Sequence, residues 1–235
     1  MILKKWDDLP ENFKNDDVKR YYELLCKKKC SLLFKRVFDI VVSALMLIIL
    51  SPLFVILAVI IKIDSRGPVF YRQVRVTKYG KEFRIFKFRT MVQNADKMGT
   101  LVTVNNDSRV TKTGRFLRKY RLDEICQLID VLRGTMTFVG TRPEVPKYVE
   151  HYSDEMLATL LLPAGITSKT SIYYKDESAL LENAEDADKT YIEEVLPAKM
   201  KYNLKWIEEF SFFSDIKVLF MTAAAMLGKS YDDCE

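Results

Sequence analysis

Histidine and cysteine are scarce in this chain of 235 residues, which has one histidine and four cysteines. The cysteines form no Cys-x-x-Cys pair and lie in no histidine-rich segment; they are Cys26, Cys30, Cys126 and Cys234. This spacing argues against a zinc site, because zinc sites usually draw on clustered Cys and His ligands. The scatter fits a reducing, cytosolic compartment better than a disulfide-stabilised secreted protein.

The chain also lacks a cleavable signal peptide, internal repeats and low-complexity tracts. Residues 1–34 are polar and charged, so the hydrophobic run that follows begins too late for the apolar part of such a signal. Hydrophobic residues make up 49% of the chain and charged residues 29%, which argues against disorder. The length allows one core, and we expect the hydrophobic run to remain in the mature protein.

The net charge of +5 is mild, but the charges are unevenly distributed. Basic residues gather on both sides of the hydrophobic run, whereas acidic residues collect from about position 176 to position 194. Basic residues beside an apolar segment indicate an anionic lipid or a phosphorylated ligand.

Residues 40–61 carry no charge, and this run is long enough to cross a bilayer as a helix. Ser51 and Pro52 stand in its middle. Proline removes a backbone donor and clashes with the preceding turn, so we expect a bend there, with Ser51 able to hydrogen-bond freed backbone groups. A helix that crosses the membrane once, kinked at proline, is the alternative that the sequence leaves open.

The flanks of the run favour the first of these two arrangements. Both are basic; the flanking cations are Lys35 and Arg36 before the run, and Lys62, Arg66 and Arg72 after it. Because basic flanks prefer the cytoplasm, both ends should lie on that side. We therefore predict a re-entrant helix-break-helix over residues 35–63.

The rest of the chain predicts an α+β fold that is mostly helical. Two β-rich runs, Val69–Val76 and Phe83–Phe88, are separated by a turn and predict a hairpin, with a possible bulge at residues 85–86. Residues 109–132 predict a helix interrupted near its acidic pair, and residues 178–200 an acidic helix. Prolines and glycine mark a loop-rich section between positions 143 and 165.

The C-terminal part combines aromatic residues and lysines with the short apolar stretch DIKVLFMTAAAML. This stretch is too short to span a membrane, and its composition is typical of an amphipathic helix lying at the bilayer interface. A helix buried in the protein core is an equally good interpretation.

The chemistry concentrates in the segment RFLRKYRLDEICQLIDVLRG. Asp123 and Glu124 follow a run of cations, in which Arg115 and Arg118 share one helix face and form a candidate phosphate-binding surface. Two carboxylates beneath cations suit a metal-bound diphosphate, since one acid can attack phosphorus while the other holds a hard divalent ion. Alone this signal is weak, because an acidic pair at the start of a helix usually balances the helix dipole and neighbouring charge.

Three segments taken together resemble the bacterial sugar transferase family, whose members are monotopic phosphoglycosyl transferases. They are FKRVFDIVVSALMLIILSPLFVILAVIIKIDSRGPVFYRQVRVTKYGKEFRIFKFRTM, RFLRKYRLDEICQLIDVLRGTMTFVGTRPEVP and FSFFSDIKVLF. The resemblance implies transfer of a phosphosugar from a nucleotide diphosphate sugar, commonly a UDP-sugar, to polyprenyl (undecaprenyl) phosphate. The products would be polyprenyl-diphosphate-sugar and UMP, Mg²⁺ would be required, and the reaction would initiate glycan assembly.

The resemblance also implies a location and a division of the chain. We expect the protein at the cytoplasmic face of the bacterial inner membrane, in contact with membrane lipid. Residues 1–34 would form a cytosolic lead, residues 35–63 the re-entrant helix and residues 64–235 the catalytic domain, as in a minimal member of the family. We expect no nucleic-acid partner, and a homodimer is left open.

Position by position, the resemblance makes Asp123 the nucleophile, which forms an aspartyl phosphosugar intermediate, and Glu124 the Mg²⁺ ligand. Arg118, Arg142 and Lys87 match basic residues of family motifs and are expected to bind the substrate. Arginine in such positions can bind phosphate oxygens bidentately. Ser51 and Pro52 match the family's membrane break.

The resemblance leaves the roles of several further positions open. Asp215 matches a family motif in which it either caps the last helix or belongs to the site. The chain departs from the common pattern at Thr141, at residues 168–170 and at Asn203, which leaves the acidic pair intact and the choice of sugar open. From another class of function, a membrane-tethered module that binds anionic lipid or nucleic acid without catalysis also explains the charge and the anchor. That module has no use for an acidic pair among cations.

Overall fold

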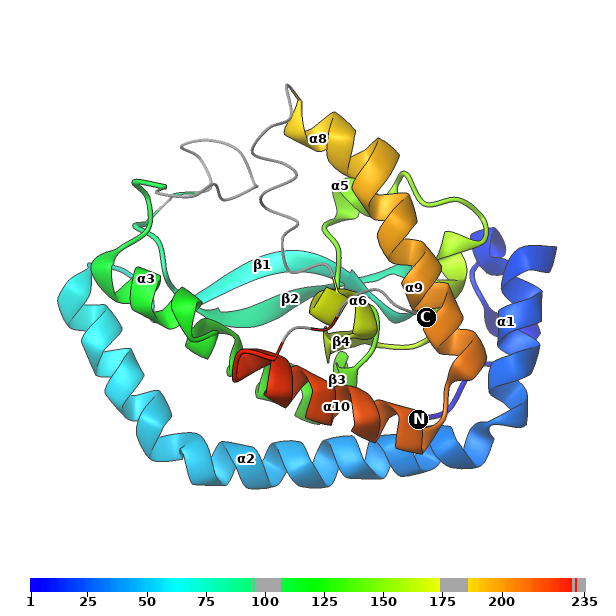
Figure 1. The fold of residues 1–235 in the computed structure, drawn as a ribbon, viewed down its shortest axis with the longest axis horizontal. Coiled ribbons are helices and arrows are strands. Elements are labelled where there is room, and N and C mark those ends of the chain that lie inside the picture. Colours follow the sequence, from blue (N-terminus) through cyan, green and yellow to red (C-terminus); the bar gives the residue numbers. More distant parts are fainter. Residues whose placement is uncertain (94, 96–106, 174–185, 230, 232–235) are drawn as a thin grey trace.

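We describe the chain from a computed structural model, which places residues 1–93, 95, 107–173, 186–229 and 231. The described part is mostly helical, as the sequence predicts, and has two small sheets, the predicted hairpin and a parallel pair that the sequence analysis did not predict (Figure 1). The elements are α1 Asp16–Lys27, α2 Lys29–Asp64, β1 Phe70–Thr77, β2 Lys81–Phe88, α3 Lys112–Lys119, α4 Gln127–Arg133, β3 Met136–Val139, α5 Pro146–Val149, β4 Ala164–Thr167, α6 Lys169–Tyr173, α8 Ala187–Thr190, α9 Leu196–Glu209 and α10 Phe212–Met226. Short 3-10 turns connect several of them, including η5 Leu122–Glu124.

Helix α2 carries the hydrophobic run, and among the described residues it is the one helix long and apolar enough to cross a membrane. It runs beneath the rest of the molecule and then bends upward (Figure 1). Pro52 lies inside it, and the helix continues past the proline, so the structure shows a bend where the sequence predicts a break. Pro52 has no N–H to donate to the carbonyl of Ile48, and the Ser51 hydroxyl donates to that carbonyl instead, at 2.8 Å. The predicted hydrogen-bonding role of Ser51 is confirmed.

The N-terminal part of α2 is fastened to the body of the protein. Lys35 forms a buried ion pair with Asp215 of α10. The Arg36 guanidinium donates to the last carbonyls of α4, those of Val131 at 2.7 Å and Leu132 at 3.0 Å. These bonds satisfy carbonyl groups that have no partner within their own helix.

The C-terminal end of α2 is fastened to the same body. Arg89, directly after β2, donates to the carbonyls of Ser65 and Arg66 at 2.7 and 3.0 Å. The backbone N–H of Thr113 donates to the carboxylate of Asp64 at 3.2 Å. Both ends of the apolar helix therefore meet one folded unit, and the bend lies between them (Figure 1).

Strands β1 and β2 form the predicted antiparallel hairpin. Pairing is one to one from Phe70 with Phe88 to Thr77 with Lys81, so the predicted bulge at residues 85–86 is wrong. The shift in hydrophobic alternation there arises because both hairpin faces meet apolar or aromatic neighbours. The connecting turn places Tyr79 and Gly80 in the left-handed region, with φ of 61° and 71°.

The core lies between the hairpin turn, the parallel pair β3–β4, α1 and α9. Trp206 of α9 and Phe210, directly after that helix, are buried in it, which agrees with the core interpretation for this part of the C-terminal region. Hydrophobicity alone does not distinguish lipid from protein as the apolar neighbour. Of the predicted helix 178–200, residues 178–185 lie outside the described part, and the chain is helical from Ala187 onward.

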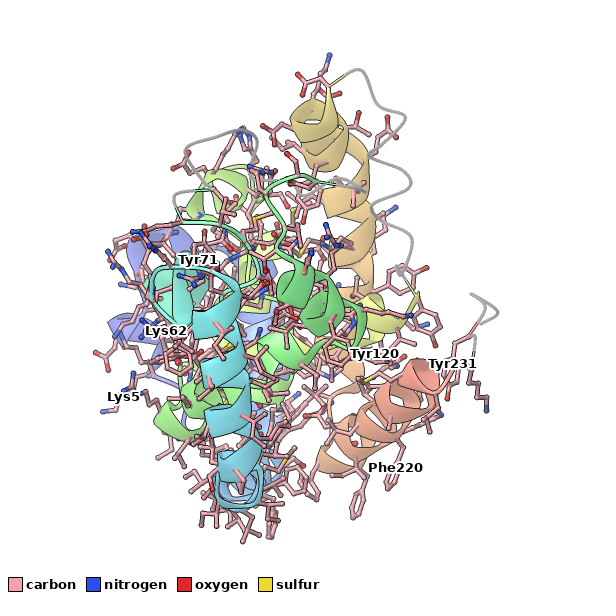
Figure 2. The ribbon with its side chains drawn as sticks, turned by 90° about the vertical axis from the view of Figure 1, so that its left-hand side faces the viewer. Lys5, Lys62, Tyr71, Tyr120, Phe220 and Tyr231 are labelled. Atoms are coloured by element: carbon pink, nitrogen blue, oxygen red, sulfur yellow. The ribbon has the colours of Figure 1, made fainter. Side chains whose placement is uncertain are left out.

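Helix α10 combines the two interpretations of the C-terminal stretch. Asp215 and Val218 are buried, whereas the large apolar side chains of Phe213 and Phe220 are 82% and 73% exposed. Phe220 points away from the body of the molecule (Figure 2). One face of the helix packs on the core and the other presents apolar surface outward, as in an interfacial helix.

Candidate active site

The predicted helix over residues 109–132 is interrupted immediately before the acidic pair. Arg121 adopts a left-handed conformation with φ of 53°, which ends the segment begun by α3. Asp123 and Glu124 follow on η5, and α4 begins only at Gln127. On a 3-10 turn successive side chains are about 120° apart, so the two carboxylates face different neighbours.

Glu124 faces two cations that come from distant parts of the chain. Its Oε1 accepts from Lys87 Nζ at 3.0 Å and from Arg142 at 2.5 Å, and Arg142 also reaches Oε2 at 3.4 Å. The carboxylate is only 13% exposed. Although burial opposes ionisation, Arg142 and Lys87 hold the pKa of Glu124 well below its usual range. Glu124 is therefore ionised at neutral pH and holds the side chains of Lys87 and Arg142 in place.

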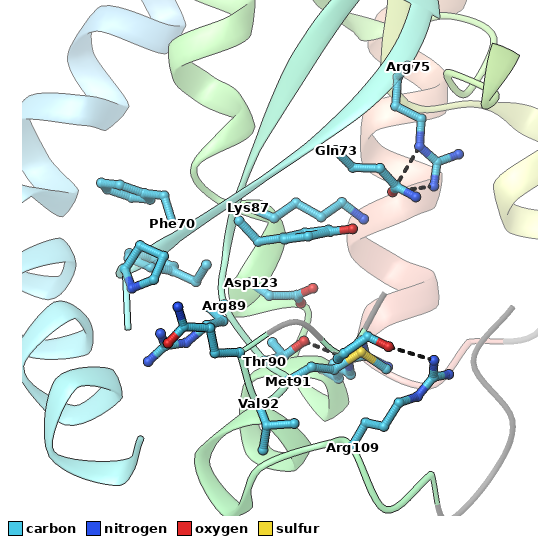
Figure 3. A pocket seen from close by; sticks show the side chains of 16 residues that line it. Phe70, Gln73, Arg75, Lys87, Arg89, Thr90, Met91, Val92, Arg109 and Asp123 are labelled. Carbon is cyan, nitrogen blue, oxygen red and sulfur yellow. Dashed lines mark hydrogen bonds between the residues drawn. The ribbon is translucent and has the colours of Figure 1, made fainter. Parts of the chain in front are cut away.

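Asp123 faces a pocket of about 480 Å³ and lies near its centre in Figure 3. Within the described ranges, no other side chain donates a hydrogen bond to its carboxylate. Burial and the charge of Glu124 raise the pKa of Asp123, while Lys87 and Arg118 act in the opposite direction. A half-buried carboxylate that opens onto a pocket is well placed to react with what binds there.

The walls of this pocket come from the strand ends of the hairpin and from α3. The cationic side chains that line it are Arg75, Lys87, Arg89, Arg109 and Arg118, and the apolar ones include Phe70, Phe88 and Met91. A pocket with several cations and an apolar side suits a ligand that is anionic and amphipathic.

Arg118 is positioned by close packing of α3 on the segment after β2. Its Nε donates to the Thr90 hydroxyl at 2.8 Å. A Cβ on Gly114 would lie 1.9 Å from the Thr90 carbonyl oxygen, so only glycine allows this approach. The glycine thereby brings Arg118 to the pocket wall.

The structure brings together most of the residues predicted from the sequence. Lys87, Arg118 and Asp123 line one pocket, and Arg142 joins them through Glu124. Arg115 is exposed and does not line this pocket, because α3 turns it toward solvent.

Two neighbours were missed by sequence reasoning. Gln73 and Arg75 line the pocket on the same strand face, and Gln73 Oε1 accepts from Arg75 at 2.8 and 3.1 Å (Figure 3). Their spacing of two on β1 is the signal that could have placed them beside Lys87, which pairs with Tyr71.

Asp215 has a supporting role outside the pocket. Ser211, not Asp215, caps α10, since its hydroxyl accepts from the Ser214 N–H. Asp215 instead binds Lys35 of α2 and accepts from the Trp206 indole at 2.9 Å. It joins the apolar helix to α9 and α10.

The site has few protein ligands for a metal ion. Among the described residues there is no group of three or more His, Cys, Asp or Glu side chains that could hold one. Mg²⁺ commonly binds through one or two carboxylates plus substrate phosphates and waters. The adjacent carboxylates of Asp123 and Glu124 fit that manner of binding and do not fit an all-protein cage.

Comparison with known proteins decides the family. Residues 30–229 match the family described as bacterial sugar transferase. The chain belongs to this family. The match covers nearly all of the apolar helix, the hairpin and the acidic pair, and residues 1–29 lie outside it.

Several curated relatives are similar over most of the chain. A UDP-glucose:undecaprenyl-phosphate glucose-1-phosphate transferase of Klebsiella pneumoniae is 36% identical over 198 residues, which is 82% of this chain and 40% of the relative. A UDP-N-acetylgalactosamine-undecaprenyl-phosphate N-acetylgalactosaminephosphotransferase of Aeromonas hydrophila is 34% identical over 82% of this chain and 43% of its own length. The uncharacterized sugar transferase EpsL of Bacillus subtilis is 31% identical over 83% of this chain and 88% of its own. The chain thus spans less than half the length of the first two.

Proposed function

We propose that this protein transfers a phosphosugar from a UDP-sugar to polyprenyl phosphate, giving polyprenyl-diphosphate-sugar and UMP and so initiating the assembly of a glycan. The observation that carries the proposal is the Asp123 carboxylate in a cation-lined pocket, to which no side chain of the described residues donates, beside a Glu124 already held by two cations. The names of the relatives, which act on undecaprenyl phosphate, support the same reaction class.

In the first step, a carboxylate oxygen of Asp123 attacks the phosphorus that carries the sugar. The bond from that phosphorus to the bridging oxygen breaks, and UMP leaves with the electron pair. Asp123 is the better candidate because it lines the pocket, whereas Glu124 does not and its Oε1 is engaged by Lys87 and Arg142. Arg118 and Lys87, both on the pocket wall, stabilise the negative charge that develops on the phosphate oxygens.

In the second step, a phosphate oxygen of the polyprenyl phosphate attacks the same phosphorus. The acyl phosphate bond to Asp123 breaks and the carboxylate is regenerated. The raised pKa of Asp123 favours the first step, since a less stabilised, more basic carboxylate than Glu124 is the better nucleophile. In the second step, Lys87 and Arg118 on the pocket wall assist its departure by stabilising the regenerated carboxylate.

Mg²⁺ is part of the proposal, with Glu124 as its expected protein ligand beside Asp123. When bound, the ion would neutralise diphosphate charge and make phosphorus more electrophilic. Glu124 Oε2 accepts only the long 3.4 Å contact from Arg142 among the hydrogen bonds identified within the described residues, so it keeps capacity for a ligand.

Trapping of the covalent intermediate tests the mechanism. Incubation with UDP-sugar and Mg²⁺, without polyprenyl phosphate, should give protein that carries one phosphosugar by intact mass spectrometry. Asp123→Asn should abolish the adduct and the release of UMP. Arg115→Ala serves as the matched control, since that residue is exposed and lies outside the pocket. An active Asp123→Asn enzyme without any adduct would refute the assignment of the nucleophile.

We further propose that α2 enters the membrane from the cytoplasm and returns to it. Supporting this, both ends of α2 bond to one folded body, at Arg36 and at Ser65, and Pro52 bends the helix between them. The outward apolar faces of α2 and α10 would contact lipid. A single crossing would separate these two ends by the thickness of the bilayer.

Cysteine labelling tests this topology. Lys4→Cys and Lys81→Cys place probes at exposed positions before α2 and after it, in a background whose native cysteines are replaced. A membrane-impermeant reagent should miss both probes in intact cells and label both after permeabilisation. Labelling of one probe alone in intact cells would restore the single crossing.

A further inference from the structure

A second, smaller cavity of about 30 Å³ lies beside Arg142, one of the two cations that bind Glu124. Every side chain that lines it is polar, and Arg142 is shared between its wall and the ion pair with Glu124. A cavity of about 10 Å³, lined by Arg75, Lys87 and Arg142, adjoins both this small cavity and the large pocket through shared residues. Arg75, Lys87 and Arg142 therefore link the walls of the three spaces.

Two residues that the sequence analysis singled out as departures meet in this small cavity. The Thr170 hydroxyl donates to Asn203 Oδ1 at 2.8 Å. Both residues are 96% buried and come from α6 and α9. Because Oδ1 is engaged by Thr170, the free end of the Asn203 amide is its NH₂ group.

Within the part of the chain that the structure describes, that NH₂ group is a buried donor without a good acceptor. Its identified partner is the thioether sulfur of Met200 at 3.6 Å, which is a weak acceptor. A buried donor left without a proper partner costs roughly as much as the hydrogen bond it forgoes. An oxygen of a bound ligand would remove that cost.

The charged side chains around the cavity already have partners within the protein. Glu144 accepts from Lys199 at 3.2 Å and from the Tyr191 hydroxyl at 2.6 Å, and Arg142 pairs with Glu124. Arg142 and Lys199 outnumber Glu144 in its wall, so the size of the cavity, not its charge, limits what it can hold. A volume of about 30 Å³ accommodates one or two water-sized groups, which suits a hydroxyl and is too small for an acetamido group.

We infer that this cavity receives a hydroxyl group of the donor sugar, and that Thr170 and Asn203 are specificity-determining residues for it. The inference rests on the proposed function, since it places the sugar beyond the phosphorus that Asp123 attacks. Thr170 orients the amide, and the Asn203 NH₂ donates to the sugar hydroxyl.

Deoxy analogues of the best UDP-sugar, each lacking one hydroxyl, provide the test. In the wild type, one analogue should lose roughly 3- to 10-fold in kcat/KM for UMP release, the value of one neutral hydrogen bond. In Thr170→Val and in Asn203→Ala that particular penalty should vanish, while the penalties of the other analogues persist. Thr159→Val is the matched control, because Thr159 is equally buried, bonds only to the backbone carbonyl of Met156 and lines neither cavity.

Thermal unfolding checks that each variant is folded. If a variant does not fold, Ser171→Ala takes its place, since Ser171 is half-buried and lines the same cavity. An equal loss with all donors, with every deoxy penalty unchanged, would overturn the inference and leave a structural role. The proposed function fails separately, if the wild type releases no UMP and forms no adduct with any UDP-sugar.

Discussion

Neutralising each carboxylate of the acidic pair should shift the stability of the protein in opposite directions. Glu124→Gln removes the anion between Lys87 and Arg142, whereas Asp123→Asn removes an anion that burial and Glu124 both disfavour. Gln and Asn keep the size of the side chains, so the change is mainly one of charge. We expect Glu124→Gln to lower Tm and Asp123→Asn to raise it.

The magnitude for Glu124 follows from its partners. Breaking a buried ion pair by removing one partner costs about 3–5 kcal/mol. The Arg142 side chain is 34% exposed and solvent offsets part of this cost, so about 2–3 kcal/mol is the expected loss in free energy of unfolding. For a chain of this size, that corresponds to a fall in Tm of roughly 4–12 °C.

The pH dependence of the two variants gives a second readout. The folded pKa of Glu124 is depressed, so its stabilisation is complete above the ordinary carboxyl pKa and is lost as pH falls below it. The folded pKa of Asp123 is raised, so its destabilisation is complete at neutral pH and is relieved as the group becomes protonated in acid. The difference in Tm between each variant and the wild type should therefore become smaller as the pH is lowered through the range in which carboxyl groups titrate.

Thermal unfolding of the detergent-solubilised protein measures these shifts. Glu11→Gln is the control, since Glu11 is 88% exposed in its pair with Lys14 and should change Tm little. Shifts of the same sign in Glu124→Gln and Asp123→Asn, or none in either, would refute the electrostatic assignment of the pair. UMP release should fall in both variants, with partial recovery of Glu124→Gln at high Mg²⁺.

Three further predictions concern the supports of the site and the membrane helix. Arg118→Ala should reduce kcat/KM for the UDP-sugar by at least tenfold, since a charge-assisted hydrogen bond is worth about 1.5–3 kcal/mol, while Arg115→Ala stays near wild type; equal effects would contradict the pocket assignment. Gly114→Ala should force α3 away from Thr90 and lower both Tm and UMP release, and a variant with wild-type values for both would show that the contact is dispensable. Pro52→Ala should straighten α2, so that the Lys81→Cys probe becomes labelled from outside in part of the population; unchanged protection would show that the bend does not depend on proline.

The sequence predicts the local elements of this fold better than their surroundings. The apolar helix, the hairpin and the interrupted helix before Asp123 all follow from periodicity, turn residues and proline. The burial of Trp206 and the exposure of Arg115 do not, because each depends on which element packs against the helix. For Arg115 that packing depends on the contact between Gly114 and Thr90, which no local pattern shows.

The candidate site likewise has features that the sequence predicts and features that only the fold shows. Asp123, Glu124, Lys87 and Arg142 are found through family motifs, which record outcomes of folding that periodicity does not. The different surroundings of the two acids are visible only in the structure, since the contacts of Glu124 cross 37 and 18 positions of the chain. Asn203 and residues 168–170 stand out in the sequence only as departures, and their meeting at one cavity requires the fold.

The fastening of α2 at both ends has a consequence for biogenesis. During synthesis the helix leaves the ribosome well before its partners, Leu132 in α4 and Asp215 in α10, have been made. Until those partners exist, only the basic flanks and the Pro52 bend are present to keep both ends on one side. In the proposed re-entrant topology, the orientation set early by charge would then be stabilised late by these tertiary contacts. A variant lacking Asp215 would therefore begin with the correct orientation and lose it slowly with age, whereas one lacking the flanking cations would be misoriented from the start.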